Sequence, residues 1–175
     1  RFALTGESDE ENLAKARNAY IRAGEILEDK IKLMDKQIRT EGEYDSDLQK
    51  NLEKVARHYH RTISDVHHDI AVSYEHNDKG VRYGEGFDVD KAVEAWDMSL
   101  KHLEPFSDRA DFRNKIDERL WNRAVALVNG GRVEEGAEAV RDYAEKTGKI
   151  DIASTFYRNG FGLAEGRDRR LARYY

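Results

Sequence analysis

The chain has no cysteine among its 175 residues, and it has only one proline. The absence of cysteine excludes disulfide bonds, a thiolate nucleophile and a metal site built on cysteine. A single proline, Pro105, in a chain with 37% charged residues leaves long stretches without a helix breaker, which favours a helical protein over a sheet protein. There is also no run of 18 apolar residues, so the sequence predicts no membrane-spanning helix.

Several motifs that mark enzymes are missing as well. The glycines between Gly80 and Gly86 do not follow the G-x-x-x-x-G-K-[ST] order of a phosphate-binding loop. The sequence contains no G-x-S-x-G nucleophile elbow and no H-E-x-x-H zinc motif. We therefore expect that the chain is not an enzyme and that it needs no cofactor.

The charge of the chain bears on its partners. The formal net charge is −5 at pH 7, whereas a nucleic-acid binder needs a basic surface to neutralise phosphates. Arginines gather only near the C-terminus, at Arg167, Arg169, Arg170 and Arg173, and such a charge run predicts a solvated helix face. We expect a protein or peptide partner and no nucleic acid.

The first residue is Arg1 rather than methionine. We interpret this as the mark of a processed or trimmed product, whose signal or anchor segment would not be visible. The absence of cysteine is tolerated equally in the cytoplasm and the periplasm, so the compartment stays open. One alternative function is therefore an accessory subunit of an extracytoplasmic assembly, such as a lipoprotein or a transport-associated component.

Apolar residues at three- and four-residue steps predict two long helices in the first half of the chain. The first begins at the capped, acidic stretch from Ser8 and continues to about Ile38, and the second runs from about Leu48 to Tyr74. Polar residues after Gly42 separate the two helices. We expect a long antiparallel hairpin over residues 9–78, and its apolar stripe also allows a homodimer.

Shorter helices are predicted in the second half. One begins after Asp90, which we expect to be its cap, and is stopped by Pro105. The others run from about Asp111 to Asn129, from Val133 to Lys146, from Asp151 to Glu165, and from Arg167 onward. Gly131 lies at a turn that requires a left-handed backbone. The expected whole is a single all-α domain over residues 1–175.

Two helices of the second half carry a repeated pattern of small and large apolar residues. It comprises Leu120, Ala124, Leu127, Gly131, Gly136, Val140 and Tyr143. Ala92, Trp96 and Ser99 match part of the pattern in an earlier helix. The pattern resembles the tetratricopeptide repeat, whose period is about 34 residues. The resemblance implies antiparallel helical hairpins stacked as a short α-solenoid over residues 88–175, although the long N-terminal hairpin departs from the family.

The same resemblance implies a scaffold or adaptor that binds a protein or peptide in a concave groove lined by the first helices of the repeats. The residues that would project into this groove are Glu118, Trp121, Asn122, Val125, Asn129, Phe156 and Tyr157. An asparagine beside a tryptophan can hold an extended peptide by amide hydrogen bonds and apolar stacking. The alternative is that Trp121 packs against a neighbouring helix.

Histidines are concentrated in the second predicted helix. His60 and His67 are seven residues apart and share one helix face, and Asp65-x-x-His68 has the spacing of an acid–histidine pair in di-iron bundles. A metal-binding helical bundle is therefore another alternative function, with candidate ligands Asp65, His68, His60 and His76. The main prediction is that no metal binds, because this face can also hold histidines that are exposed or hydrogen-bonded to acids.

Overall fold

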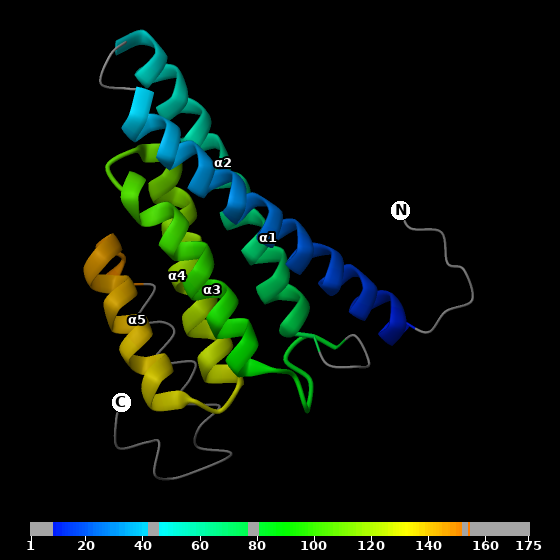
Figure 1. Cartoon of the computed structure of the whole chain (residues 1–175). Coiled ribbons are helices and arrows are strands. Elements are labelled where there is room, and N and C mark those ends of the chain that lie inside the picture. The colour runs from blue at the N-terminus through cyan, green and yellow to red at the C-terminus, as the bar shows by residue number, and fades with distance from the viewer. Residues whose placement is uncertain (1–8, 42–45, 77–80, 152–153, 155–175) are drawn as a thin grey trace.

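A computed structural model describes residues 9–41, 46–76, 81–151 and 154, and this part of the chain is all-helical, as predicted (Figure 1). The elements are α1 (Asp9–Glu41), α2 (Ser46–Tyr74), α3 (Val89–Leu103), the 3-10 turn η1 (Glu104–Phe106), α4 (Ala110–Asn129) and α5 (Val133–Thr147). The sixth and seventh predicted helices lie almost wholly outside the described residues. Each of the five long helices packs on the next one in chain order.

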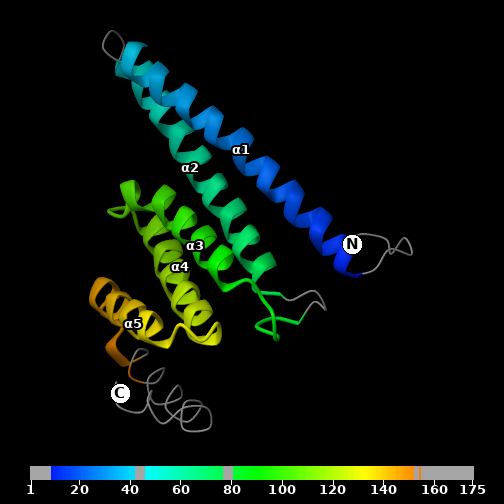
Figure 2. The ribbon, with the colours of Figure 1, turned by 60° about the horizontal axis from the view of Figure 1, so that its bottom comes forward.

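Helices α1 and α2 form the long hairpin that the sequence predicts, with the two helices running in opposite directions. Helix α3 packs against α2, α4 packs on α3 and α5 packs on α4, and the connection end of the hairpin projects beyond these three helices in both views (Figures 1 and 2). None of the described helices combines the length and the apolarity needed to cross a membrane.

The cap of α3 differs from our prediction. Asp88, not Asp90, caps the helix, because its side chain accepts a hydrogen bond from the backbone N–H of Lys91 at 3.1 Å. Asp90 lies within the first turn and pairs with Arg132 at 2.8 Å. The loop before α3 therefore enters the helix two residues earlier than the sequence pattern indicates. At the other end, α3 stops at Leu103, and Pro105 lies in η1 as its helix-stopping role predicts.

The main core lies where α2, α3, α4 and α5 meet. Its largest member is Trp96, whose side chain is fully buried. The other buried members are Ile70, Ala71, Val93, Ala95, Ala124, Ala126, Leu127, Ala139 and Val140. Half of this cluster is alanine, so the helices can approach closely and enclose one large indole.

A buried carboxylate joins α2 to this core. Glu75 is fully buried and accepts a hydrogen bond from the Trp96 indole N–H at 2.9 Å. Its other oxygen accepts hydrogen bonds from the Arg82 guanidinium, with contacts at 3.0 and 2.8 Å. The backbone carbonyl of Glu75 also accepts from the N–H of Tyr83 at 2.6 Å. These bonds fix the loop that leads into α3.

Two glycines shape the α4–α5 hairpin. Gly131 has a φ of 81°, which confirms the left-handed backbone predicted at this turn. Gly136 is buried where α5 crosses α4, and a Cβ atom there would overlap Cγ2 of Val128. This contact explains why glycine, and not alanine, stands at position 136.

We predict that Arg82→Gln destabilises the fold, because it leaves the buried Glu75 carboxylate without a counter-charge. Removing one partner of a fully buried ion pair costs roughly 3 to 5 kcal/mol of unfolding free energy. Because Arg82 is half exposed, we expect a smaller loss here, of about 2 to 3 kcal/mol. Urea denaturation measures the loss. The double variant with Glu75→Gln should recover part of it, since the amide oxygen still accepts from Trp96; no recovery would contradict the assigned role.

We predict that Gly136→Ala also destabilises the protein, although alanine favours helices. Overpacking against Val128 costs about 1 to 3 kcal/mol, whereas the gain in helix propensity is at most about 1 kcal/mol. Adding Val128→Ala should make Gly136→Ala neutral or stabilising relative to Val128→Ala alone. Thermal and urea unfolding of the four proteins test this coupling. Stabilisation by Gly136→Ala alone would show that α4 and α5 separate freely.

Candidate functional site

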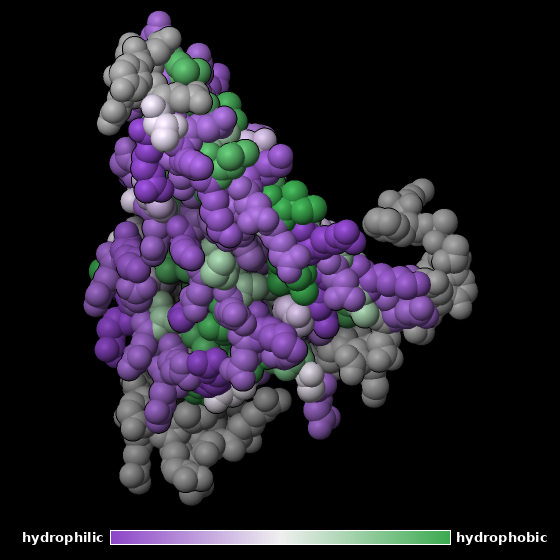
Figure 3. Space-filling model, in the orientation of Figure 1, coloured by the Kyte–Doolittle hydropathy of each residue, from purple (hydrophilic) through white to green (hydrophobic). Residues whose placement is uncertain are grey.

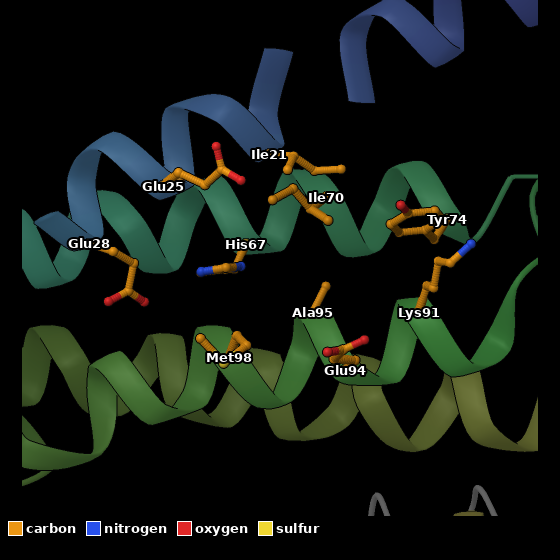
Figure 4. Close-up of a pocket in the computed structure, with 11 residues that line it drawn as sticks. Ile21, Glu25, Glu28, His67, Ile70, Tyr74, Lys91, Glu94, Ala95 and Met98 are labelled. Atoms are coloured by element: carbon orange, nitrogen blue, oxygen red, sulfur yellow. The ribbon is translucent and has the colours of Figure 1, made fainter. Parts of the chain in front are cut away.

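A groove lies between α1 and α3, with α2 as its floor (Figure 4). It encloses a pocket of about 400 Å³, which falls within the size range of ligand sites. Figure 3 shows apolar atoms between the ridge of the hairpin and α3, on a surface that is otherwise mainly hydrophilic. The lining residues are Ile21, Gly24, Glu25 and Glu28 of α1, His67, Ile70 and Tyr74 of α2, and Lys91, Glu94, Ala95 and Met98 of α3.

Helix α1, which forms one wall of the groove, is attached to α2 at two places. Arg17 donates to the Ser73 carbonyl at 2.8 Å and lies over the Tyr74 ring at 4.2 Å, so the first half of α1 is bound to the end of α2. Gly24 is buried where α1 meets α2, and a Cβ there would lie 3.7 Å from Val66. Because α1 rests on α2 at these points, its other flank faces α3 across the groove.

The middle of the groove is apolar and its rims are acidic. Ile21, Ile70 and Met98 lie toward its centre, whereas Glu25 and Glu94 are exposed on opposite walls (Figure 4). The positive charge of Lys91 is balanced by an ion pair with Asp88 at 2.9 Å. The groove therefore combines an apolar floor with net negative charge.

One end of the groove adjoins a cluster of three histidines and a glutamate. His102 of α3 is buried, and its Nε2 lies 2.9 Å from Oε1 of Glu28 on α1. The Nδ1 atoms of His102 and His60 are 3.2 Å apart. The His67 ring stacks on that of His102, with centroids 5.9 Å apart and planes at 6°. Three helices thus contribute to one cluster.

The environment of the cluster favours the neutral forms of His67 and His60. Burial, which is the larger cause, and the neighbouring His102 together lower the pKa of His67 to about 4. Burial and His102 also lower the pKa of His60 below its ordinary value. Neutral rings keep a nitrogen lone pair, which is the form that binds metal ions.

Glu28, His67 and His102 have the arrangement of a metal-binding group. One potential ligand atom from each residue lies within 4.8 Å of those of the other two. Nε2 of His67 is buried and has no hydrogen-bond partner in the described structure. A ring nitrogen of His67 points toward Glu28 (Figure 4). A buried ring nitrogen without a partner is unusual and calls for a specific explanation.

Of the metal ligands that the sequence suggested, only His60 belongs to this cluster. Asp65 instead pairs with Lys115 at 2.6 Å and Arg119 at 3.0 Å, both on α4. His68 contacts Asp69 at 3.0 Å and the Trp96 ring, and Nδ1 of His76 lies 2.7 Å from the Val72 carbonyl oxygen. These three residues are not brought together.

The face of α4 that the repeat pattern suggested is partly occupied by contacts within the chain. Trp121 is half-buried and its ring lies 5.4 Å from that of Tyr143, so the alternative packing role applies to it. The Asn129 amide donates to the Val125 carbonyl at 2.8 Å, and Glu118 pairs with Arg119 at 3.0 Å. Asn122 is half-buried. Phe156 and Tyr157 lie outside the described residues.

Comparisons with protein-family models, curated proteins and solved structures give no match to this chain. The groove and the cluster are therefore the features that bear on function.

The sequence contained a partial signal for this site. His60 and His67 share a helix face by their spacing, which indicates a common neighbour. No local pattern connects them to Glu28 or His102, because those residues come from α1 and α3 and meet α2 only after packing.

Proposed function

We propose that the chain is a protein- or peptide-binding scaffold and that the partner lies in the groove between α1 and α3. The observation that carries this proposal is the apolar pocket floored by Ile70 and flanked by exposed acids. The lining residues His67, Ile70 and Tyr74 follow one face of α2 over seven residues, or about 10 Å of helix. That length accommodates about two turns of a helical partner.

The charges of the groove specify the partner further. Glu25 and Glu94 flank the apolar floor from opposite walls, and Lys91 is neutralised by Asp88. An amphipathic helix with apolar residues on one face and basic residues beside them would complement both features. We therefore propose a basic amphipathic segment as the occupant.

The tetratricopeptide-like arrangement remains part of this proposal. The ion pairs of Lys115 and Arg119 with Asp65 connect α4 to α2. In this proposal α2 pairs with α3 as the unit that precedes the α4–α5 hairpin, so α2 and α4 are the first helices of successive units. Contacts between equivalent elements of successive units are the basis of repeat stacking. In this proposal the long hairpin adds α1 to the array and thereby forms the groove.

We predict that Ile21→Lys weakens binding of a short, labelled amphipathic helix made of leucine and lysine by about tenfold or more. The change places a charged side chain in the apolar part of the groove, where one well-packed residue contributes at least about 1.4 kcal/mol. Fluorescence anisotropy measures the affinity, and circular dichroism confirms that the variant is folded. Raising the salt concentration should weaken binding, because the rims attract the lysines.

Ile150→Lys is the matched control, since Ile150 is 66% exposed and is not among the groove residues. It should leave the affinity unchanged, and a peptide with glutamate in place of lysine should bind more weakly than the lysine peptide. Equal losses in the Ile21 and Ile150 variants would contradict the proposed location. Loss only in a Trp121→Ala, Asn122→Ala variant would place the partner on the α4 face instead.

The exposed apolar residues of the hairpin are consistent with the homodimer that the sequence allows. Ile26 and Leu33 on α1 are 55% and 52% exposed, and Leu48 and Val55 on α2 are 38% and 42% exposed. Each pair is seven residues apart, which is the spacing of a seam between paired helices. We propose that a second copy of the chain covers this surface.

We predict that Leu33→Glu converts the dimer to a monomer, because a carboxylate in an apolar seam is costly to desolvate. Size-exclusion chromatography with light scattering gives the mass. The control is Lys32→Glu, which adds negative charge at an exposed neighbouring position. A wild-type chain that stays monomeric at high concentration would refute the homodimer.

A further inference from the structure

We propose that Glu28, His67 and His102 bind one Zn²⁺-type divalent cation at the junction of α1, α2 and α3. The proposal rests on the geometry of the cluster and does not require the proposed partner, although Glu28 and His67 also line the groove. Two imidazoles and one carboxylate, with no thiolate, form a donor set that suits zinc and neighbouring first-row metals rather than magnesium or calcium.

The distances show how the site would assemble. Oε1 of Glu28 and Nε2 of His102 are already 2.9 Å apart. In a tetrahedral zinc site with metal–ligand bonds of about 2.0 Å, two ligand atoms lie about 3.3 Å apart, so this pair is close to the required separation. The whole group spans up to 4.8 Å, so His67 must move by an ångström or so toward the other two. Its Nε2 has no competing hydrogen bond in the described structure.

The cation would replace the proton that Glu28 and His102 now share. A carboxylate oxygen accepts hydrogen bonds, so Nε2 of His102 carries the proton directed at Glu28. When the cation binds Nε2 of His102, the proton on that atom leaves to solvent, and the proton on Nδ1 of His60 transfers to Nδ1 of His102. Nδ1–H of His102 then donates a hydrogen bond to Nδ1 of His60, and His60 takes up a proton from solvent at its Nε2, so no net proton is released.

His60 is therefore a positioning residue. It orients the His102 ring through a hydrogen bond to Nδ1 of His102, while Nε2 of His102 faces the cation. Metal-bound histidines commonly have such a hydrogen-bond partner on their second ring nitrogen. The ring of Phe106 packs 5.2 Å from His60 and limits its movement. The Glu28–His102 contact is a direct link between α1 and α3, so an occupied site would fix α1 across one end of the groove.

The proposal is tested by titrating the purified whole chain, first treated with a chelator, with Zn²⁺ in a calorimeter. We expect one Zn²⁺ per chain and a rise in the unfolding temperature, since an ion that binds the folded state stabilises it by mass action. Co²⁺ should give the visible absorption of a tetrahedral site with nitrogen and oxygen ligands. Mg²⁺ should produce no change.

Glu28→Gln and His67→Asn should each weaken Zn²⁺ binding more than about tenfold, and His60→Asn by about 10- to 100-fold, as for other residues that orient a metal ligand. Glu28 and His67 are only half-buried, so these variants should fold, and circular dichroism checks that they do. The matched control is His58→Asn, at an exposed position of the same helix. It should bind Zn²⁺ like the wild type.

Two outcomes would overturn the proposal. One is the absence of stoichiometric Zn²⁺ binding by the wild-type chain. The other is binding that persists in folded Glu28→Gln and His67→Asn proteins but is lost in His58→Asn, which would locate the ion on the outer face of α2. Neither outcome bears on peptide binding in the groove, which is measured separately in the presence of a chelator.

Discussion

A carboxylate with no access to solvent, Glu75, sets the constraint on which the remaining structure depends. A buried charge must be matched by hydrogen bonds and a counter-charge, and Glu75 obtains them from Trp96 and Arg82. The first bond positions α3 on α2 through its largest core side chain. The second closes the loop that delivers the chain to the α3 cap at Asp88. One wall of the groove and the location of His102 both follow from that placement of α3.

Helix α2 relates the two proposed sites to each other. It packs against both α1 and α3, and it supplies the floor of the groove and two histidines of the cluster. The groove exists because α1 is anchored to α2 through Arg17 and meets it closely at Gly24. The Glu28–His102 contact then spans the gap at one end. The partner site and the cation site are thus built on a common helix, and they share Glu28 and His67 where the cluster adjoins the groove.

Local patterns sufficed to predict the helices, because apolar spacing and turn residues act over a few positions. The left-handed Gly131 and the bounds of α4 are examples. The cap at Asp88 was missed since Asp90 offers the same side chain two residues later, and the choice depends on how the loop is held by Glu75. The cluster could not be predicted because His60–His102 and His102–Glu28 join residues 42 and 74 positions apart. Such contacts arise only when three helices pack.

The floor of the groove is also part of the core. Ile70 and Ala95 line the pocket and belong to the buried cluster around Trp96. Ligand binding in the groove and folding are consequently linked equilibria. Any molecule that binds the groove of the folded protein raises the melting temperature, by an amount that depends on its concentration and affinity. A melting-temperature screen would therefore report ligands directly, whatever their chemical class. The same linkage implies that sequence change at the groove floor is restricted to residues that preserve the fold, whereas the exposed walls are free to vary in specificity.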